Sequence, residues 1–154
     1  MTDQAFRYEP AVDDPGWFTW DLIDQTRFNP QAMGKMLTRV EDLPNGGRAS
    51  RLRMFPERSH SNLLDAVHGG VTLALIDISL FSAMRTLTGG DAAGSVTLDL
   101  STQFIGAGQI GSPLDAVVEI LRETGRLMFL RGLVVQGDNT IAAFNGTIRK
   151  PTKR

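Results

Sequence analysis

One carboxylate interrupts an apolar helical segment. A helix is predicted over residues 69–87, and Asp77 is its only acidic residue. On a helical wheel, small hydroxyl side chains gather on the side opposite Asp77, whose own side holds Leu73, Leu80, Phe81 and Met84. Asp is a poor mid-helix residue, and an unpaired buried carboxylate is unfavourable. We interpret Asp77 as a catalytic acid, base or nucleophile; the alternative is that it pairs with a distant Arg or caps a loop.

The sequence His68-Gly69-Gly70 precedes and opens this helix. The first N–H groups of a helix have no partner within the helix, and the helix dipole favours negative charge there. Glycine also lets a ligand approach the backbone closely. The motif can therefore hold an oxyanion. One alternative is that the two glycines only allow the loop to join the helix. Another is that His68 has a structural role, in packing or as a helix cap.

Gly69 and Asp77 are too far apart to share one small substrate carbonyl on a single helix. They are eight residues apart, which is about 12 Å along the axis at 1.5 Å per residue. Two such helices packed antiparallel about a two-fold axis bring each Asp77 to the partner's Gly69. The spacing therefore predicts a homodimer with two shared active sites.

The flanking sequence predicts strands around this one helix. Residues 36–43 and 48–55 flank the turn signal Pro44-Asn45-Gly46-Gly47. Residues 89 and 90 are a glycine pair typical of a helix stop. Short, turn-rich connections separate the later strands and favour antiparallel pairing. The expected fold is α+β, an antiparallel sheet on a single helix, and its later strands are residues 95–105, 113–121, 126–136 and 140–148.

Two further patterns concern the strand at residues 95–105. Strict alternation places Val96, Leu98, Leu100 and Phe104 on one side and Thr97, Asp99, Ser101 and Gln103 on the other. The following Gly106-Ala107-Gly108-Gln109-Ile110-Gly111 matches a dinucleotide-binding pattern, but such a site needs a helix next and Ser112-Pro113 leads into a strand. We therefore predict a glycine-rich hairpin there.

The spacing of Asn62, His68-Gly69-Gly70 and Asp77, followed by the strand Ser95-Val96-Thr97-Leu98-Asp99, resembles that of the hotdog-fold acyl-CoA thioesterases. The resemblance is to the phenylacetic-acid-degradation type in particular. Ala83, Gly125-Arg126 and Asn145-Gly146-Thr147 extend it. It covers residues 36–150. Residues 1–35 form an N-terminal extension in which a short helix is a candidate, and residues 151–154 form a basic tail.

The resemblance implies the fold, the assembly and the roles of individual residues. The fold would be one long helix wrapped by a five- or six-stranded antiparallel sheet, in dimers or tetramers. Gly69 would donate its N–H to the thioester oxygen, and Asp77 would be general base or nucleophile. Asn62 would hold the water or carbonyl, and Thr97 would position the water or the carboxylate. The catalytic assignment is Asp77, Gly69, Asn62, His68 and Thr97, and the substrate-binding assignment is Gly70, Phe81, Phe104, Arg122 and Arg126.

The predicted activity is hydrolysis of an acyl-CoA to free acid and CoA. Cations near the site would meet the CoA phosphates, and Arg122, Arg126, Arg149 and Lys150 are candidates, although plain surface charge is an equal alternative. The competing function is a non-catalytic hotdog protein that binds acyl-CoA. A hotdog dehydratase or hydratase is disfavoured, because no catalytic His is paired with a carboxylate in the required way.

Composition narrows the remaining classes. The 154 residues include no Cys and two His, which excludes disulfides, thiolate nucleophiles and a three-histidine metal site within one chain. A net charge of −1 disfavours nucleic acid as a partner. Polar residues break the apolar stretch 71–80, and the first residues lack a signal-peptide pattern. We expect a cytoplasmic protein without metal, cofactor or membrane partner.

Overall fold

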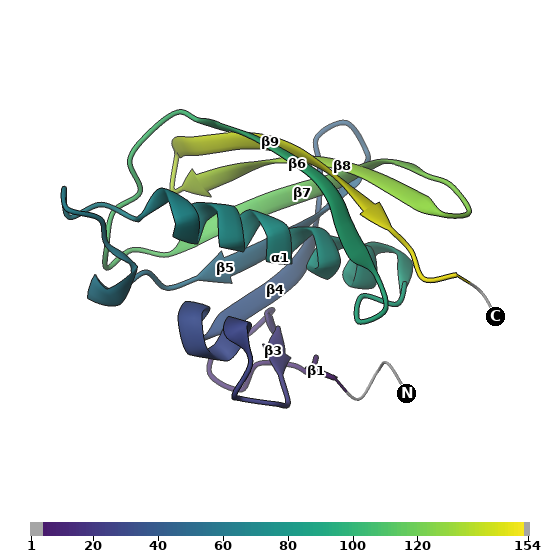
Figure 1. Cartoon of the computed structure of the whole chain (residues 1–154), viewed down its shortest axis with the longest axis horizontal. Helices are drawn as coiled ribbons and strands as arrows, with labels where there is room; N and C mark the ends of the chain where they lie inside the picture. Colours follow the sequence, from purple (N-terminus) through teal and green to yellow (C-terminus); the bar gives the residue numbers. More distant parts are fainter. Residues whose placement is uncertain (1–4, 153–154) are drawn as a thin grey trace.

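One long helix lies across a large antiparallel sheet that curves around it (Figure 1). The computed structural model describes residues 5–152. The helix, α1 (Gly69–Thr88), is wrapped by a seven-stranded sheet in the order β2-β4-β5-β7-β8-β9-β6, with antiparallel pairing throughout. This arrangement is the hotdog fold predicted from the sequence.

Six strands of the sheet are long, and the remaining elements are short. The long strands are β4 (Met36–Asp42), β5 (Arg48–Met54), β6 (Val96–Phe104), β7 (Leu114–Glu123), β8 (Leu127–Gln136) and β9 (Asn139–Arg149). The short elements are β1 (Phe6–Arg7), β2 (Phe18–Thr19), β3 (Asp21–Leu22), a π-helical turn η2 (Asn29–Met33) and a 3-10 turn η3 (Arg58–His60).

The connections confirm one predicted hairpin and correct another. Gly46, with φ of 86°, and the Asn45 side chain, which accepts a 2.9 Å hydrogen bond from Gly47 N, form the tight turn between β4 and β5. The predicted hairpin after residue 105 is wrong, because β6 pairs with β9 while β7 pairs with β5 and β8. Segment 106–111 instead crosses from the edge of the sheet to its centre. A short connection permits a hairpin but does not determine which strands pair. Here α1 connects β5 to β6 at the far edge of the sheet, so β7 returns to pair with β5 at the centre.

Both ends of α1 are closed by the predicted residues. The His68 side chain accepts a 2.8 Å hydrogen bond from Gly70 N, so it is the helix N-cap. Gly89 ends the helix in the left-handed conformation, with φ of 69°.

The hydroxyl-bearing side of α1 faces the sheet. The Ser79 hydroxyl donates to Ile76 O at 2.6 Å, and Ser82 lies 2.8 Å from the Thr38 hydroxyl of β4, so these buried polar groups are satisfied. Among residues 5–152, α1 alone has the length and apolar composition of a membrane span, and it forms the centre of the folded core. The more open side of α1 is the one that carries Asp77.

The N-terminal segment, residues 5–35, closes over the edge of the sheet. Strand β2 pairs with β4, and a tryptophan lies on either side of β2 in the sequence. Trp20 is 1% exposed within the core, and the Trp17 ring contacts the guanidinium groups of Arg39 and Arg53, which lie 4.3 and 4.6 Å from its centroid. At the other end of the segment, buried His60 holds Ala32 O at 2.8 Å from its Nε2. The segment is therefore fixed at several points rather than attached only by its chain.

An ion-pair cluster around one buried carboxylate supports the Trp17 contact. Asp115 of β7 is 4% exposed and accepts hydrogen bonds from Arg51 at 2.9 Å and from Arg53 at 2.8 Å. Arg51 also binds Glu41, and these hydrogen bonds hold the pKa of Glu41 below its ordinary value. Arg53 is thus held in place where it meets Trp17.

Candidate active site

The Asp77 carboxylate is half-buried and bound to a hydroxyl rather than to a cation. Thr97 Oγ1 of β6 donates to Asp77 Oδ1 at 2.6 Å. Within residues 5–152 this hydroxyl is the sole hydrogen-bond or ion-pair partner of the carboxylate. The alternative that Asp77 forms a structural pair with an Arg therefore finds no support in this part of the chain. A carboxylate held by one oxygen keeps the other available to accept a proton from water.

Thr97 reaches Asp77 because β6 contains a bulge. The pairing of β6 with β9 shifts between Thr97 and Asp99, which leaves Leu98 outside the regular register. The strict alternation predicted for this strand is therefore wrong. Thr97 faces α1, and so do Leu100 and Phe104, which the alternation placed on the opposite side from Thr97.

The first turn of α1 leaves one N–H group unpaired. Gly70 N donates to the His68 side chain, and Val71 N and Thr72 N donate to His68 O at 2.9 and 3.1 Å. Among the residues described, nothing accepts the N–H of Gly69. The Phe104 ring borders this position, 3.5 Å from where a Gly69 Cβ would lie. Gly69 is thus the free donor at the helix end, while His68 organises its neighbours.

Asn62 shapes the loop before α1. Its Oδ1 accepts hydrogen bonds from Leu64 N at 2.9 Å and from Ala66 N at 3.1 Å. The carbonyl oxygen is therefore used within the loop, and in residues 5–152 the side-chain NH₂ has no acceptor. Leu63 and Leu64 are both highly exposed at the loop tip. In this single chain Asn62 meets neither Asp77 nor Thr97.

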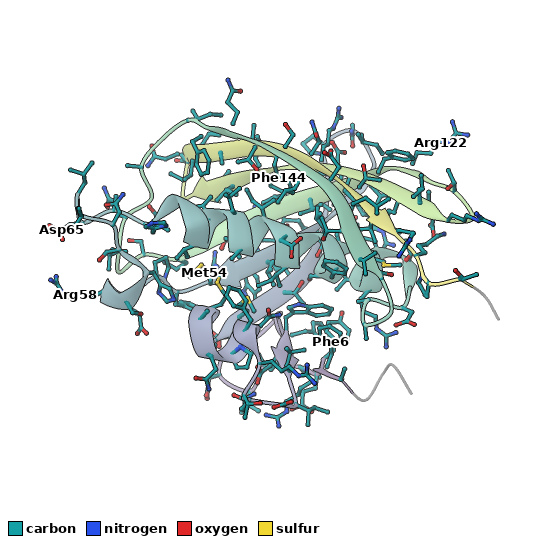
Figure 2. All side chains as sticks on the ribbon, viewed as in Figure 1. Phe6, Met54, Arg58, Asp65, Arg122 and Phe144 are labelled. Atoms are coloured by element: carbon teal, nitrogen blue, oxygen red, sulfur yellow. The ribbon has the colours of Figure 1, made fainter. Side chains whose placement is uncertain are left out.

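Asp77 lines a cavity of about 620 Å³, which we call the Asp77 cavity. Ile78 and Phe81 of α1 continue its wall, and Phe6, Trp20 and Leu22 of the N-terminal segment face them. Figure 2 shows Phe6 in the short strands beside α1. Phe81 was assigned to substrate binding from the sequence, whereas no individual residue of the N-terminal segment was assigned to it. The aromatic residues of segment 5–35 were visible in the sequence, but no periodicity placed them against the helix.

Six of the ten assigned residues form two groups within one chain. Asp77, Thr97 and Phe81 lie together at the Asp77 cavity. Gly69, with Gly70 and Phe104 beside it, lies two turns away at the helix start. This separation is the one expected from eight residues of helix, about 12 Å.

The candidate CoA-binding cations lie at the sheet rather than in the cavity. Arg149 of β9 pairs with Val96, next to Thr97, and Lys150 N donates to Arg126 O at 2.8 Å. Arg122 of β7 is separated from β6 by β8 and β9, and lies at the opposite end of the long axis from Asp65 (Figure 2). Residues 5–152 contain no cluster of three His, Asp or Glu side chains that could hold a metal ion.

Comparison with known proteins identifies the family. The sequence profile of the thioesterase superfamily matches residues 64–143, which include α1 and most of the later strands. The chain belongs to the thioesterase superfamily. This confirms the family resemblance drawn from the sequence. No curated protein gives a sequence match.

Solved structures agree with the thioesterase fold. Zebra fish thioesterase superfamily member 2 aligns with a TM-score of 0.68 and 22% identity, over 82% of this chain and 88% of that one. A variant of the phenylacetic acid degradation protein PaaI from Thermus thermophilus aligns with a TM-score of 0.63 and 21% identity, over 79% and 96%. A conserved protein from Pseudomonas aeruginosa aligns with a TM-score of 0.61 and 25% identity, over 66% and 80%.

Proposed function

We propose that this thioesterase superfamily member hydrolyses an acyl-CoA to a free acid and CoA. The observation that carries the proposal is the half-buried Asp77 carboxylate, bound by Thr97 at 2.6 Å and lining a cavity of about 620 Å³. The free N–H of Gly69 supplies the second element that thioester hydrolysis needs. Such a donor stabilises the negative charge that develops on the carbonyl oxygen.

In the proposed reaction, the thioester oxygen accepts a hydrogen bond from the Gly69 N–H of one subunit while Asp77 of the other subunit takes a proton from water. The water oxygen bonds to the carbonyl carbon, the tetrahedral intermediate collapses, and the C–S bond breaks. Asp77 then returns the proton to the leaving sulfur. The alternative route is direct attack by the Asp77 carboxylate, which breaks the C–S bond, releases CoA as the thiolate and forms a mixed anhydride; water then hydrolyses the anhydride and protonates the thiolate. Thr97 orients the carboxylate in both routes.

The proposed active unit is a homodimer, with a dimer of dimers as the larger alternative. Strand β6 is an edge of the sheet, since β9 is its only neighbour among the described strands. Leu98 and Phe104 on this edge are 53% and 54% exposed, and an exposed apolar edge strand is a template for pairing with a second chain. Such pairing gives Asp77 access to the partner's Gly69. We assign this assembly to the cytoplasm, because α1, which has the length and apolar composition of a membrane span, is enclosed in the core.

The test is a release assay for free CoA over a panel of acyl-CoA substrates. The protein contains no cysteine, so a thiol reagent reports only released CoA. Asp77→Asn keeps the oxygen that Thr97 binds but removes the base, and kcat should fall at least about 100-fold. Asp42→Asn is the matched control, because Asp42 is exposed on β4, which four strands separate from β6, and its replacement should leave kcat unchanged.

The outcomes separate an enzyme from a binding protein. Wild type that releases no CoA from any substrate, yet binds acyl-CoA in calorimetry, would establish the non-catalytic alternative. Equal activity of Asp77→Asn and wild type would remove Asp77 from the chemistry.

A further inference from the structure

We infer that the N-terminal segment, residues 5–35, forms the acyl-binding wall of the active site and restricts it to bulky, uncharged acyl groups. This inference rests on the proposed hydrolysis at Asp77. Eight of the fourteen residues around the Asp77 cavity precede residue 30, outside the region matched by the family profile. The cavity is thus built by the particular N-terminal sequence of this chain.

The walls nearest Asp77 are apolar and partly aromatic. Phe81 follows Asp77 by one helical turn, and Phe6 stacks on Trp20 with ring centroids 4.7 Å apart. Leu22 and Ile23 complete the facing wall, and the register of β1 with β3 pairs Phe6 with Leu22. An acyl chain that extends from a carbonyl at Asp77 would leave water and contact this surface. The free energy of this transfer is favourable in proportion to the apolar area buried.

The charges around the cavity leave no cation for an acidic acyl group. Arg27 is the sole cation of the described lining, and it pairs with Asp24 at 3.0 Å. Hydrogen bonds from Thr26 lower the pKa of Asp24, which keeps this partner ionised. Both side chains are at least half exposed, so this ion pair lies at the rim of the cavity. A second carboxylate on the acyl group would meet Asp77 without a compensating charge.

The cavity is also larger than a small acyl group needs. A volume of about 620 Å³ falls in the range of cavities that enclose whole drug-sized molecules, roughly 300–1,000 Å³. An acetyl group would leave most of the apolar wall in contact with water. Discrimination by size is therefore expected, with bulky acyl groups favoured.

Ile23 offers the cleanest test, because it lines the cavity and is 53% exposed, so its replacement should not disturb the core. Ile23→Trp should fill part of the cavity and lower kcat/KM for octanoyl-CoA and benzoyl-CoA about 10-fold or more, while acetyl-CoA turnover stays the same. Wild type should prefer both bulky substrates to acetyl-CoA and glutaryl-CoA. Val12→Trp is the matched control, since Val12 is 94% exposed in the same segment and lies outside this cavity.

A binding measurement separates this inference from the proposed catalysis. In the Asp77→Asn background, calorimetry should show that Ile23→Trp lowers the affinity for octanoyl-CoA about 10-fold and leaves the affinity for free CoA unchanged. That result supports the acyl wall even if wild type proves inactive in the CoA-release assay. Unchanged octanoyl-CoA affinity with normal wild-type hydrolysis would overturn the inference and leave the enzyme proposal standing. Loss of the dimer in Ile23→Trp, seen by light scattering, would also overturn it, because the cavity would then be a subunit contact.

Discussion

Gly69 and Asp77 offer complementary chemistry from two positions on one helix. The N–H of Gly69 is the one donor of the first turn that His68 leaves unused, and the Asp77 carboxylate is held by a single hydroxyl. Both groups are therefore placed by neighbours yet retain capacity for substrate. His68 and Asn62 accept hydrogen bonds from backbone N–H groups, at the helix start and in the preceding loop respectively. We propose that they contribute to catalysis by fixing this backbone.

The role of the Gly69 N–H can be tested by removing this group alone. Gly69→Pro deletes the N–H at the first helical position, where proline is well accepted. His68 already has the extended conformation, with ψ of 135°, that a residue before proline prefers. We expect kcat/KM for the best acyl-CoA to fall about 100- to 1,000-fold with little change in the free energy of unfolding.

Gly69→Ala is the control for that substitution. Its Cβ would lie 3.5 Å from the Phe104 ring, an ordinary contact, and its N–H would remain. Steady-state kinetics should therefore show a much smaller loss of kcat/KM than for Gly69→Pro, because only the close approach of substrate to this backbone is affected. A Gly69→Pro protein with full activity would show that another group binds the oxyanion.

Among the elements, the sheet depends on close approach as well as on pairing. Strand β8 runs between β7 and β9, and Gly132 sits where it meets both neighbours. A Cβ on Gly132 would overlap the Val117 carbonyl oxygen and lie 2.6 Å from Cζ of Phe144. The bulge in β6 is a similar local device, because it turns Thr97 toward α1.

Gly132→Ala should therefore destabilise the protein by about 3 kcal/mol, because backbone of β7 and a buried ring cannot both move aside. Gly125→Ala is the control, since a Cβ at Gly125 would meet nothing within 4 Å. Its free energy of unfolding should stay within about 0.5 kcal/mol of the wild-type value. Denaturant unfolding followed by circular dichroism measures both. A fully stable Gly132→Ala protein would contradict the packing described for β8.

At the level of the whole molecule, the proposed active site requires two chains. The helix separates Gly69 from Asp77 by about 12 Å, and the exposed edge of β6 provides a place for a second copy to pair. If the site is shared between subunits, mixing two inactive variants should restore activity. If the site lies within one chain, mixing should not restore it.

Mixing Gly69→Pro with Asp77→Asn should restore activity. In a mixed dimer, one site combines the intact Asp77 of one subunit with the intact Gly69 of the other, and the second site carries both defects. Random reassortment after co-refolding should give about a quarter of wild-type activity. The CoA-release assay measures the recovery, and each variant refolded alone is the control. No recovery from mixed dimers whose formation is verified by mass spectrometry would place the complete site within one chain.

The sequence by itself determined the helix, its two ends, the six long strands and the family, because these depend on local patterns, whereas the short strands β1, β2 and β3 were not predicted. Gly89 stops a helix wherever the helix lies, and the spacing from Gly69 to Asp77 does not depend on what surrounds it. The order of the strands, the inward turn of Thr97 and the N-terminal wall of the Asp77 cavity were decided by tertiary structure. Each of these depends on contacts between distant residues, as when Trp20 packs beside α1, and no local periodicity encodes which surfaces will meet.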